Sequence, residues 1–132
     1  MSIKNVTITG AAGNIAYSLI FRILSNLPFK ATDKINLTLL DIEQSQKSLT
    51  GLRFEIEDCA FPTLNKIITT DNSEKAFEHS DCIIMVGAKP RSKGMERSDL
   101  ILDNAGIFKS QAETINNVCL LYTSPSPRDC RL

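Results

Sequence analysis

A cluster of small residues follows an apolar stretch near the start of the chain, where residues 6–16 read Val-Thr-Ile-Thr-Gly-Ala-Ala-Gly-Asn-Ile-Ala. Gly10 permits a tight turn, Gly13 lets the backbone approach a ligand, and Ala16 lets a following helix lie close to the strand. The free N–H groups at the start of that helix would face an anion. This order predicts a turn that binds the pyrophosphate of a dinucleotide, and its candidate residues are Gly10, Ala11, Ala12, Gly13, Asn14, Ile15 and Ala16. The spacing is Gly-x-x-Gly-x-x-Ala and not the commoner Gly-x-Gly-x-x-Gly, so a turn without a ligand is the alternative.

An acidic residue, Asp41, ends the second apolar stretch in Leu-Leu-Asp-Ile, residues 39–42. A carboxylate at this place can accept both hydroxyl groups of an adenosine ribose and would repel a 2′-phosphate. The interval from Gly13 is longer than the usual spacing of about 20 residues, and an expected loop over residues 28–34 accounts for the difference. The sequence therefore predicts NAD as the cofactor in preference to NADP, with a solvated aspartate at a strand end as the alternative.

A cationic loop follows the apolar run that ends at Gly87, and residues 88–97 hold four basic side chains and one acidic one. Arg91 and Arg97 could each bind a carboxylate through two parallel N–H bonds, a geometry that lysine cannot reproduce. Gly94 would give the loop a hinge, so the loop could close over a small dianion and exclude water. We expect Arg91 and Arg97 to bind substrate, and a solvated basic loop is the alternative.

Two amide side chains, Asn104 and Gln111, lie seven residues apart in a predicted helix over residues 98–117. Two helical turns place them on one face, so both amides could reach a bound cofactor. They could equally be ordinary surface residues.

Composition argues against several other functions. The 15 basic and 15 acidic residues balance, and no aromatic residues are interleaved with the basic ones, so no nucleic-acid partner is expected. No apolar run is long enough to span a membrane and no targeting segment precedes the first strand, so we expect a cytoplasmic protein. The cysteines form no Cys-x-x-Cys pair and His79 has no partner at metal-ligand spacing, so we expect no metal site. Cys59 and Cys82 are expected to be buried, reduced thiols.

The 132 residues suffice for one small domain, and their apolar spacing alternates between strand and helix periods. This alternation predicts an α/β fold, a doubly wound parallel sheet of the Rossmann type with helices on both faces. Gly10, Asp41 and Gly87 each follow a strand, so they should line one rim of the ligand crevice. Ser73 and Ser98 are expected to cap the third and fourth helices. The strands are expected over 5–9, 35–40, 66–69 and 81–87, and the helices over 14–27, 45–58, 73–77 and 98–117.

Helical spacing also predicts which side chains the helices bury. In the first helix these are Ile15, Leu19, Ile20, Ile23 and Leu24; in the second, Leu49, Leu52, Phe54 and Ile56; in the last, Leu100, Ile101, Ala105, Phe108, Ala112 and Ile115.

Together these stretches resemble the cytosolic-type NAD-dependent malate dehydrogenases of the lactate and malate dehydrogenase superfamily. The resemblance runs from Lys4 to about Asn117 and is carried by residues 9–19, 39–42, 55–62, 86–91, 94–97, 104 and 107–111. It implies that the glycine-rich turn and Asp41 hold NAD, and that the residues matching Asn104 and Gln111 contact it. It also implies that Arg91 and Arg97 bind malate or oxaloacetate, and that the intact protein is a homodimer. Lactate dehydrogenases look different at the position of Arg91, where they carry an uncharged side chain.

The C-terminal run departs from the family. Residues 119–129 read Cys-Leu-Leu-Tyr-Thr-Ser-Pro-Ser-Pro-Arg-Asp. This run resembles, codon by codon, the translation of a transposase adapter used in sequencing libraries. Pro125 and Pro127 exclude a central strand there. We therefore expect residues 1–118 to be an incomplete NAD-binding domain, truncated before its last strands, and residues 119–132 to be a non-native tail.

The resemblance places the catalytic histidine, its aspartate and a further substrate arginine in the substrate domain that this chain lacks. No catalytic residue is therefore expected here, and the fragment should be inactive. The run at 81–87 should form an exposed sheet edge prone to aggregation. Two alternatives stay open: a non-catalytic NAD-binding module, and a short-chain dehydrogenase or epimerase, although the Tyr-x-x-x-Lys pair of the latter is absent.

Overall fold

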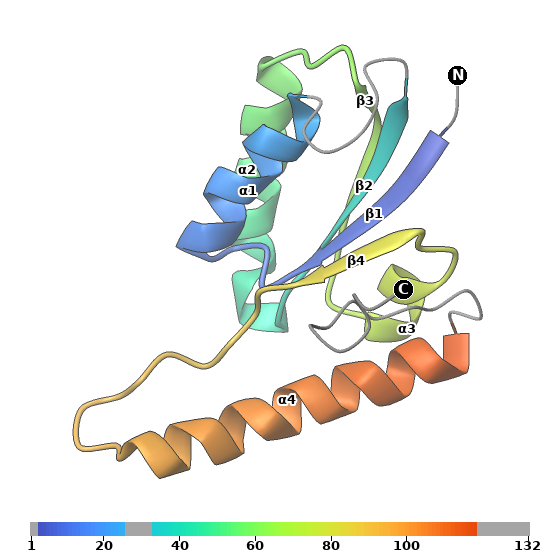
Figure 1. Ribbon diagram of the computed structural model, residues 1–132. Helices are drawn as coiled ribbons and strands as arrows, with labels where there is room; N and C mark the ends of the chain where they lie inside the picture. The colour runs from blue at the N-terminus through green and yellow to red at the C-terminus, as the bar shows by residue number, and fades with distance from the viewer. Residues whose placement is uncertain (1–2, 26–32, 119–132) are drawn as a thin grey trace, which may run out of the picture.

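The computed structural model describes residues 3–25 and 33–118. Within these two ranges, four strands and four α-helices alternate (Figure 1). The strands are β1 (Ile3–Thr9), β2 (Lys34–Leu40), β3 (Leu64–Thr70) and β4 (Cys82–Met85). The helices are α1 (Asn14–Leu24), α2 (Gln46–Asp58), α3 (Ser73–Phe77) and α4 (Arg97–Val118), with a short 3-10 turn, η1 (Glu43–Ser45), before α2.

The sheet is parallel throughout, with strand order β3-β2-β1-β4. Helices α1 and α2 cover one face and α3 and α4 lie on the other (Figure 1). The predicted doubly wound α/β fold is therefore confirmed. In register, Thr9 lies opposite both Leu40 and Met85, so the carboxyl ends of three strands meet at one edge. Among the described residues β4 pairs with β1 alone, so it is an edge strand as expected.

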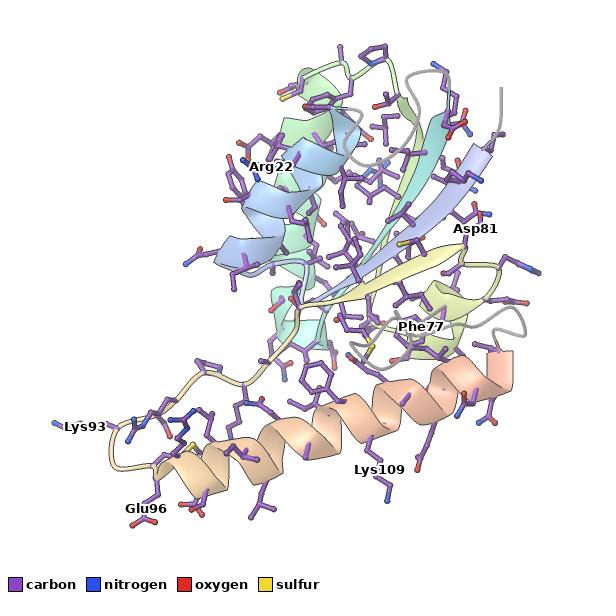
Figure 2. The ribbon with its side chains drawn as sticks, viewed as in Figure 1. Arg22, Phe77, Asp81, Lys93, Glu96 and Lys109 are labelled. Atoms are coloured by element: carbon purple, nitrogen blue, oxygen red, sulfur yellow. The ribbon has the colours of Figure 1, made fainter. Side chains whose placement is uncertain are left out.

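Two apolar clusters hold the layers together. The larger lies between the sheet and helices α1 and α2, where Ile20, Ile23, Leu49 and Ile56 are fully buried. The smaller lies on the opposite face, where Phe77 of α3 and Ile115 of α4 pack with Leu40. Figure 2 shows Phe77 between the sheet and α4. Burial of such side chains stabilises a fold by about 1.5–3 kcal/mol each.

Several predicted core positions are wrong. Ile15 is 72% exposed because it lies in the first turn of α1, and Phe54 is 58% exposed because it points away from the face of α2 that carries Leu52 and Ile56. In α4, Ile101, Ala105 and Phe108 are exposed, because only the last turns of this long helix reach the sheet and α3. Figure 1 shows its first turns extending past the sheet. Ile115 is the one residue of α4 that is buried.

Smaller predictions also needed correction. Asn72, not Ser73, caps α3, since its side chain accepts the N–H of Lys75 at 3.0 Å. Helix α4 begins at Arg97, so Ser98 lies inside its first turn. Cys59 is exposed and Cys82 half-buried; both thiols are free. The expected end of the first helix at Leu27 and the expected tail at 119–132 lie outside the described residues.

Candidate functional site: the carboxyl edge of the sheet

The turn after β1 brings two strand ends into backbone contact. Gly10 has φ +62°, and a Cβ built on it would lie 2.3 Å from the Cα of Gly87. A Cβ built on Gly87 would in turn lie 3.0 Å from the nitrogen of Gly10. The Oγ1 of Thr9, itself fully buried, accepts the N–H of Gly87 at 3.3 Å. Both glycines are therefore needed for the chain to pass from β1 into α1 beside the end of β4.

The N–H groups of the glycine-rich turn divide into two sets. Three are used within the protein: Ala11 donates to the carbonyl of Leu40 at 3.2 Å, Ala12 to Oδ2 of Asp41 at 2.9 Å, and Gly13 to the carbonyl of Gly10 at 3.0 Å. The first i to i−4 hydrogen bond of α1 comes from the N–H of Tyr17, which donates to the carbonyl of Gly13 at 3.0 Å.

The second set consists of the N–H groups of Asn14, Ile15 and Ala16, which precede that first helical bond. No side chain caps α1, and its first turn holds no acidic residue. A helix start of this kind favours a bound anion. The side chains of Ala11 and Ala16 are fully buried, so any contact of these two residues with a ligand would come from their backbone groups.

Asp41 joins the end of β2 to the glycine-rich turn. Its Oδ2 accepts the N–H of Ala12, and its Oδ1 accepts the N–H of Ile42 at 2.8 Å. Each carboxylate oxygen has two lone pairs, so both oxygens keep acceptor capacity for hydroxyl groups. The carboxylate is therefore held in place while still able to bind a ligand.

A cavity of about 470 Å³ opens at this edge of the sheet. Its size falls within the range of small-molecule and cofactor sites. The residues that line it are Gly10, Gly13, Leu40, Asp41, Ile42, Asp71, Ser73, Val86, Gly87, Ala88, Lys89, Pro90, Ile107 and Gln111. The structure thus places Gly10, Asp41 and Gly87 on one rim, as the strand order predicts.

Gln111 of α4 faces this cavity. Its Oε1 is buried without a hydrogen-bond partner among the described residues. A buried acceptor without a partner is costly, and a ligand that carries a donor would satisfy it. The open N–H groups at α1, the Asp41 carboxylate and this acceptor together suit a dinucleotide with a phosphate, a ribose and an amide.

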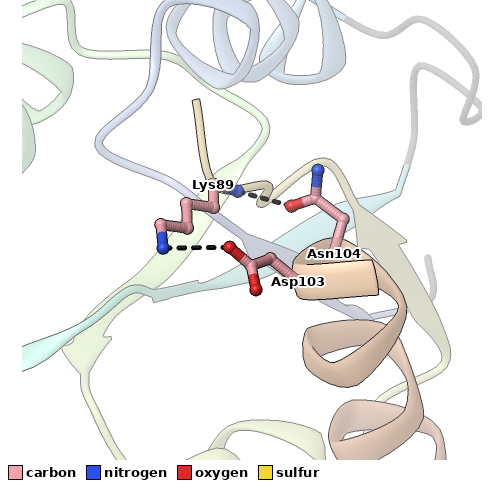
Figure 3. Close-up of polar contacts among 3 residues, drawn as sticks. All are labelled: Lys89, Asp103 and Asn104. Atoms are coloured by element: carbon pink, nitrogen blue, oxygen red, sulfur yellow. Dashed lines mark hydrogen bonds and ion pairs between the residues drawn. The ribbon is translucent and has the colours of Figure 1, made fainter. Parts of the chain in front are cut away.

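Asn104 lies outside the cavity lining. Its Oδ1 accepts the N–H of Lys89 at 2.7 Å, and the Lys89 Nζ pairs with Oδ2 of Asp103 at 3.0 Å (Figure 3). These two contacts attach the first residues of the cationic loop to α4. The Nδ2 group of Asn104 is not used in them, so a contact of Asn104 with a cofactor stays a prediction.

Arg91 and Arg97 are exposed and do not line the cavity. The Nε of Arg91 donates to the carbonyl of Met95 at 3.0 Å, which folds the loop on itself around Gly94, where φ is +83°. Figure 2 shows Lys93 and Glu96 at the outer turn of this loop, away from the sheet. Substrate binding by the two arginines therefore stays a prediction.

A smaller hollow of about 190 Å³ lies behind the turn, between α1 and α2. There the phenol of Tyr17 donates to Oε1 of Glu55, and this hydrogen bond raises the pKa of Tyr17. At the first residue of β4, away from the turn, burial raises the pKa of the Cys82 thiol, and the negative charge of Asp81 adds to the shift.

Two residues that position the site were not predicted from the sequence. Thr9 is an unremarked strand residue whose hydroxyl holds Gly87. Gln46 begins α2, and its amide contacts the carbonyl groups of Asp41, Ile42 and Thr70. The polar type of Thr9 at a buried strand position was a usable signal. No pattern in the sequence indicates Gln46.

Within residues 3–25 and 33–118, no group of three His, Cys, Asp or Glu side chains is placed to hold a metal ion. His79 is highly exposed and lies 3.5 Å from a carboxylate oxygen of Glu78. No helix in these ranges is both long and apolar enough to cross a membrane.

A doubly wound parallel sheet, a glycine-rich turn before α1 and an acidic residue at the end of β2 define a dinucleotide-binding domain. The chain belongs to the lactate/malate dehydrogenase family: residues 4–124 match the family described as "lactate/malate dehydrogenase, NAD binding domain". The cofactor is therefore NAD, and the short-chain dehydrogenase alternative is wrong. The match includes residues 119–124, the first part of the expected tail.

Solved structures agree with this assignment. A malate dehydrogenase from Naegleria fowleri is 42% identical in sequence, with a TM-score of 0.83. The matched region covers 87% of this chain and 35% of the Naegleria chain. A lactate dehydrogenase from Trichomonas vaginalis, in complex with NADH and oxamate, is 39% identical in sequence, with a TM-score of 0.79. The matched region covers 86% of this chain and 34% of the Trichomonas chain. The chain thus spans about a third of the length of these relatives.

Proposed function

We propose that this chain is the cofactor-binding part of an NAD-dependent malate dehydrogenase of the cytosolic type, which interconverts malate and oxaloacetate. Both malate and lactate dehydrogenases are among its structural relatives, at similar identity, so the choice depends on one residue. That residue is Arg91, in the loop that leaves the cavity at Lys89 and Pro90. A dicarboxylic acid needs a second cation, and lactate dehydrogenases carry an uncharged side chain at this position.

The residues of the site have separate tasks in this proposal. The N–H groups of Asn14, Ile15 and Ala16 bind the pyrophosphate, and Asp41 accepts the ribose hydroxyl groups. Asn104 and Gln111 contact the cofactor from α4. When bound, NAD supplies the hydride chemistry. The chain itself binds and orients the two ligands.

Arg91 and Arg97 must move to act on the substrate. The loop between Lys89 and Arg97 has few attachments, and Gly94 at its tip has the left-handed conformation that favours glycine. Closure would bring both guanidinium groups over the cavity, exclude water and strengthen their bonds to the carboxylates. The exposed positions of both side chains in the present conformation support an open state.

The test is the substrate preference of the full-length enzyme with Arg91→Gln. Loss of a charge-paired hydrogen bond costs at least ~2 kcal/mol, so kcat/KM for oxaloacetate should fall by at least about thirtyfold relative to that for pyruvate. Lys93→Gln removes a cation from the same loop and should change this ratio little. If Arg91→Gln leaves oxaloacetate preferred to the same degree, the assignment of malate is wrong.

Residues 119–132 are, in this proposal, a non-native tail, and the chain is inactive alone because it holds no catalytic residue. A long sequencing read of the native transcript across codon 118 tests this. An Asn-Pro-Ala-Asn turn followed by a catalytic Asp and His would support it. If the native message encodes the Ser-Pro run, a non-catalytic NAD-binding module becomes the leading function.

The intact protein would be a cytoplasmic homodimer. Exposed aromatic side chains on α1 and α2, Tyr17 and Phe54, support an interface on this side of the sheet. Sedimentation of the full-length protein and of its Phe54→Glu variant would test this, since the substitution should favour the monomer.

A further inference from the structure

The side-chain amide of Gln46 lies where β2 and β3 end. Its Nε2 is 3.0 Å from the carbonyl oxygen of Asp41, 3.2 Å from that of Ile42 and 3.2 Å from that of Thr70. The amide nitrogen has two hydrogens for these three acceptors, so at least one hydrogen is shared. One side chain therefore holds three carbonyl groups from two neighbouring strand ends.

These contacts continue the sheet beyond its last regular pair. The register of β2 and β3 ends with Leu40 opposite Thr70, and the N–H of Asp41 then donates to the carbonyl of Thr70 at a long 3.3 Å. The amide of Gln46 bonds to the same carbonyl of Thr70 and to that of Asp41. Because Gln46 is the first residue of α2, the start of a helix fixes the backbone that carries the Asp41 carboxylate.

The Asp41 carboxylate connects this fixed backbone to the glycine-rich turn through two hydrogen bonds. Its Oδ1 is held by the N–H of Ile42, whose own carbonyl accepts from Gln46, and its Oδ2 holds the N–H of Ala12. A continuous set of hydrogen bonds thus runs from Gln46 through Asp41 to Ala12. Ala12 lies next to Gly13, immediately before the open N–H groups of α1.

We propose that Gln46 is a positioning residue for the ribose end of the cofactor site, because it sets the Asp41 carboxylate and through it the glycine-rich turn. This inference rests on the proposed binding of the ribose by Asp41. Gln46 does not line the cavity, so it acts through Asp41 and not by contact with the ligand. Its effect should be larger on the dinucleotide that Asp41 selects than on the one that Asp41 repels.

The experiment compares Gln46→Met, which keeps the length of the side chain and removes its donors, with Gln44→Met. Gln44 lies in η1, two residues earlier; it is exposed and has no side-chain hydrogen bond among the described residues. Gln46→Glu is the second variant, since it keeps the shape of the side chain but places a carboxylate against three carbonyl oxygens. NAD and NADP binding are measured by titration calorimetry, and exchange of the Ala12 amide is measured without ligand.

Both Gln46 variants should weaken NAD binding by about fivefold to tenfold, as expected for a lost hydrogen bond, and NADP binding by less. Exchange of the Ala12 amide should accelerate by a similar factor, and Gln44→Met should match the wild type in every measurement. A purely structural role would weaken both nucleotides equally. The inference is overturned if the Gln46 variants weaken the binding of both nucleotides by the same factor. It is also overturned if neither nucleotide affinity nor the exchange of the Ala12 amide changes.

A positioning role of Gln46 and the binding of NAD at this site can be disproved separately. If the wild type binds NAD and the Gln46 variants keep its full NAD to NADP ratio, the inference fails and the proposed function stands. If the wild type binds neither nucleotide, the proposed function fails and the ribose role of Gln46 fails with it, even where Ala12 exchange responds.

Discussion

Gly10 and Gly87 lie in such close contact that a Cβ on Gly10 would be 2.3 Å from the Cα of Gly87. They are 77 residues apart in the sequence, yet each is the glycine that follows a strand of the same parallel pair. Both glycines line the cavity, and their contact brings the glycine-rich turn close to the start of the cationic loop.

Gly10→Ala should therefore destabilise the protein strongly. The left-handed backbone at φ +62° costs an alanine about 1–2 kcal/mol, and the overlap with backbone atoms of Gly87 adds to this, so we expect a loss of at least about 3 kcal/mol. Gly51→Ala is the matched control: its Cβ meets nothing within 4 Å in the interior of α2, and it should stabilise by about 0.5–1 kcal/mol. Urea unfolding measures both. A Gly10→Ala variant as stable as the wild type would show that the contact is described wrongly.

Asn104→Ala should release the first residues of the cationic loop. The variant removes the acceptor of the Lys89 N–H, a bond worth about 1 kcal/mol, so exchange of the Lys89 amide should accelerate about fivefold. Asp103→Ala removes only the ion pair with the Lys89 ammonium group. The two side chains are 52% and 42% exposed, so the pair contributes no more than about 1 kcal/mol. This variant should leave the exchange rate of the Lys89 amide unchanged. Exchange is the suitable readout because alanine also raises helix propensity. Equal effects of the two variants would contradict the separate roles.

The two described thiols should differ in reactivity. Burial raises the pKa of Cys82, so a smaller fraction is thiolate at a given pH than in an unperturbed thiol, and its reaction rate should continue to rise into the alkaline range. Near neutral pH we expect Cys82 to react with a disulfide reagent at least about tenfold more slowly than exposed Cys59. Cys119→Ser and Cys130→Ser provide the background for the measurement. Equal rates at the two thiols would show that Cys82 is not shielded.

The sequence predicts the sheet and its rim well for a definite reason. Parallel strands joined by helices must bring their carboxyl ends to one edge, so Gly10, Asp41 and Gly87 could be placed together without coordinates. The burial of Ile20 and Leu49 follows from helical spacing in the same way.

Other features are not contained in any local pattern. Spacing shows that Ile101 and Phe108 share an apolar side of α4, but not how much of that side the rest of the described chain covers. Ile101 stays 59% exposed and Phe108 36% exposed. Gln46 donates hydrogen bonds to backbone carbonyl groups, which every residue has. The residue types of its partners therefore could not predict these bonds. Arg91 lies outside the cavity, where its Nε donates to the backbone carbonyl of Met95, a contact that spacing cannot reveal.

We propose that the Asp41 carboxylate selects NAD over NADP at this edge of the sheet. Titration calorimetry of the wild type and of Asp41→Asn with both nucleotides measures that selection. We expect the wild type to bind NAD at least about tenfold more tightly than NADP, and Asp41→Asn to narrow that ratio, because the charge that repels a 2′-phosphate is lost. A wild type that binds both nucleotides equally, or a ratio of affinities that Asp41→Asn leaves unchanged, would show that Asp41 does not select the cofactor.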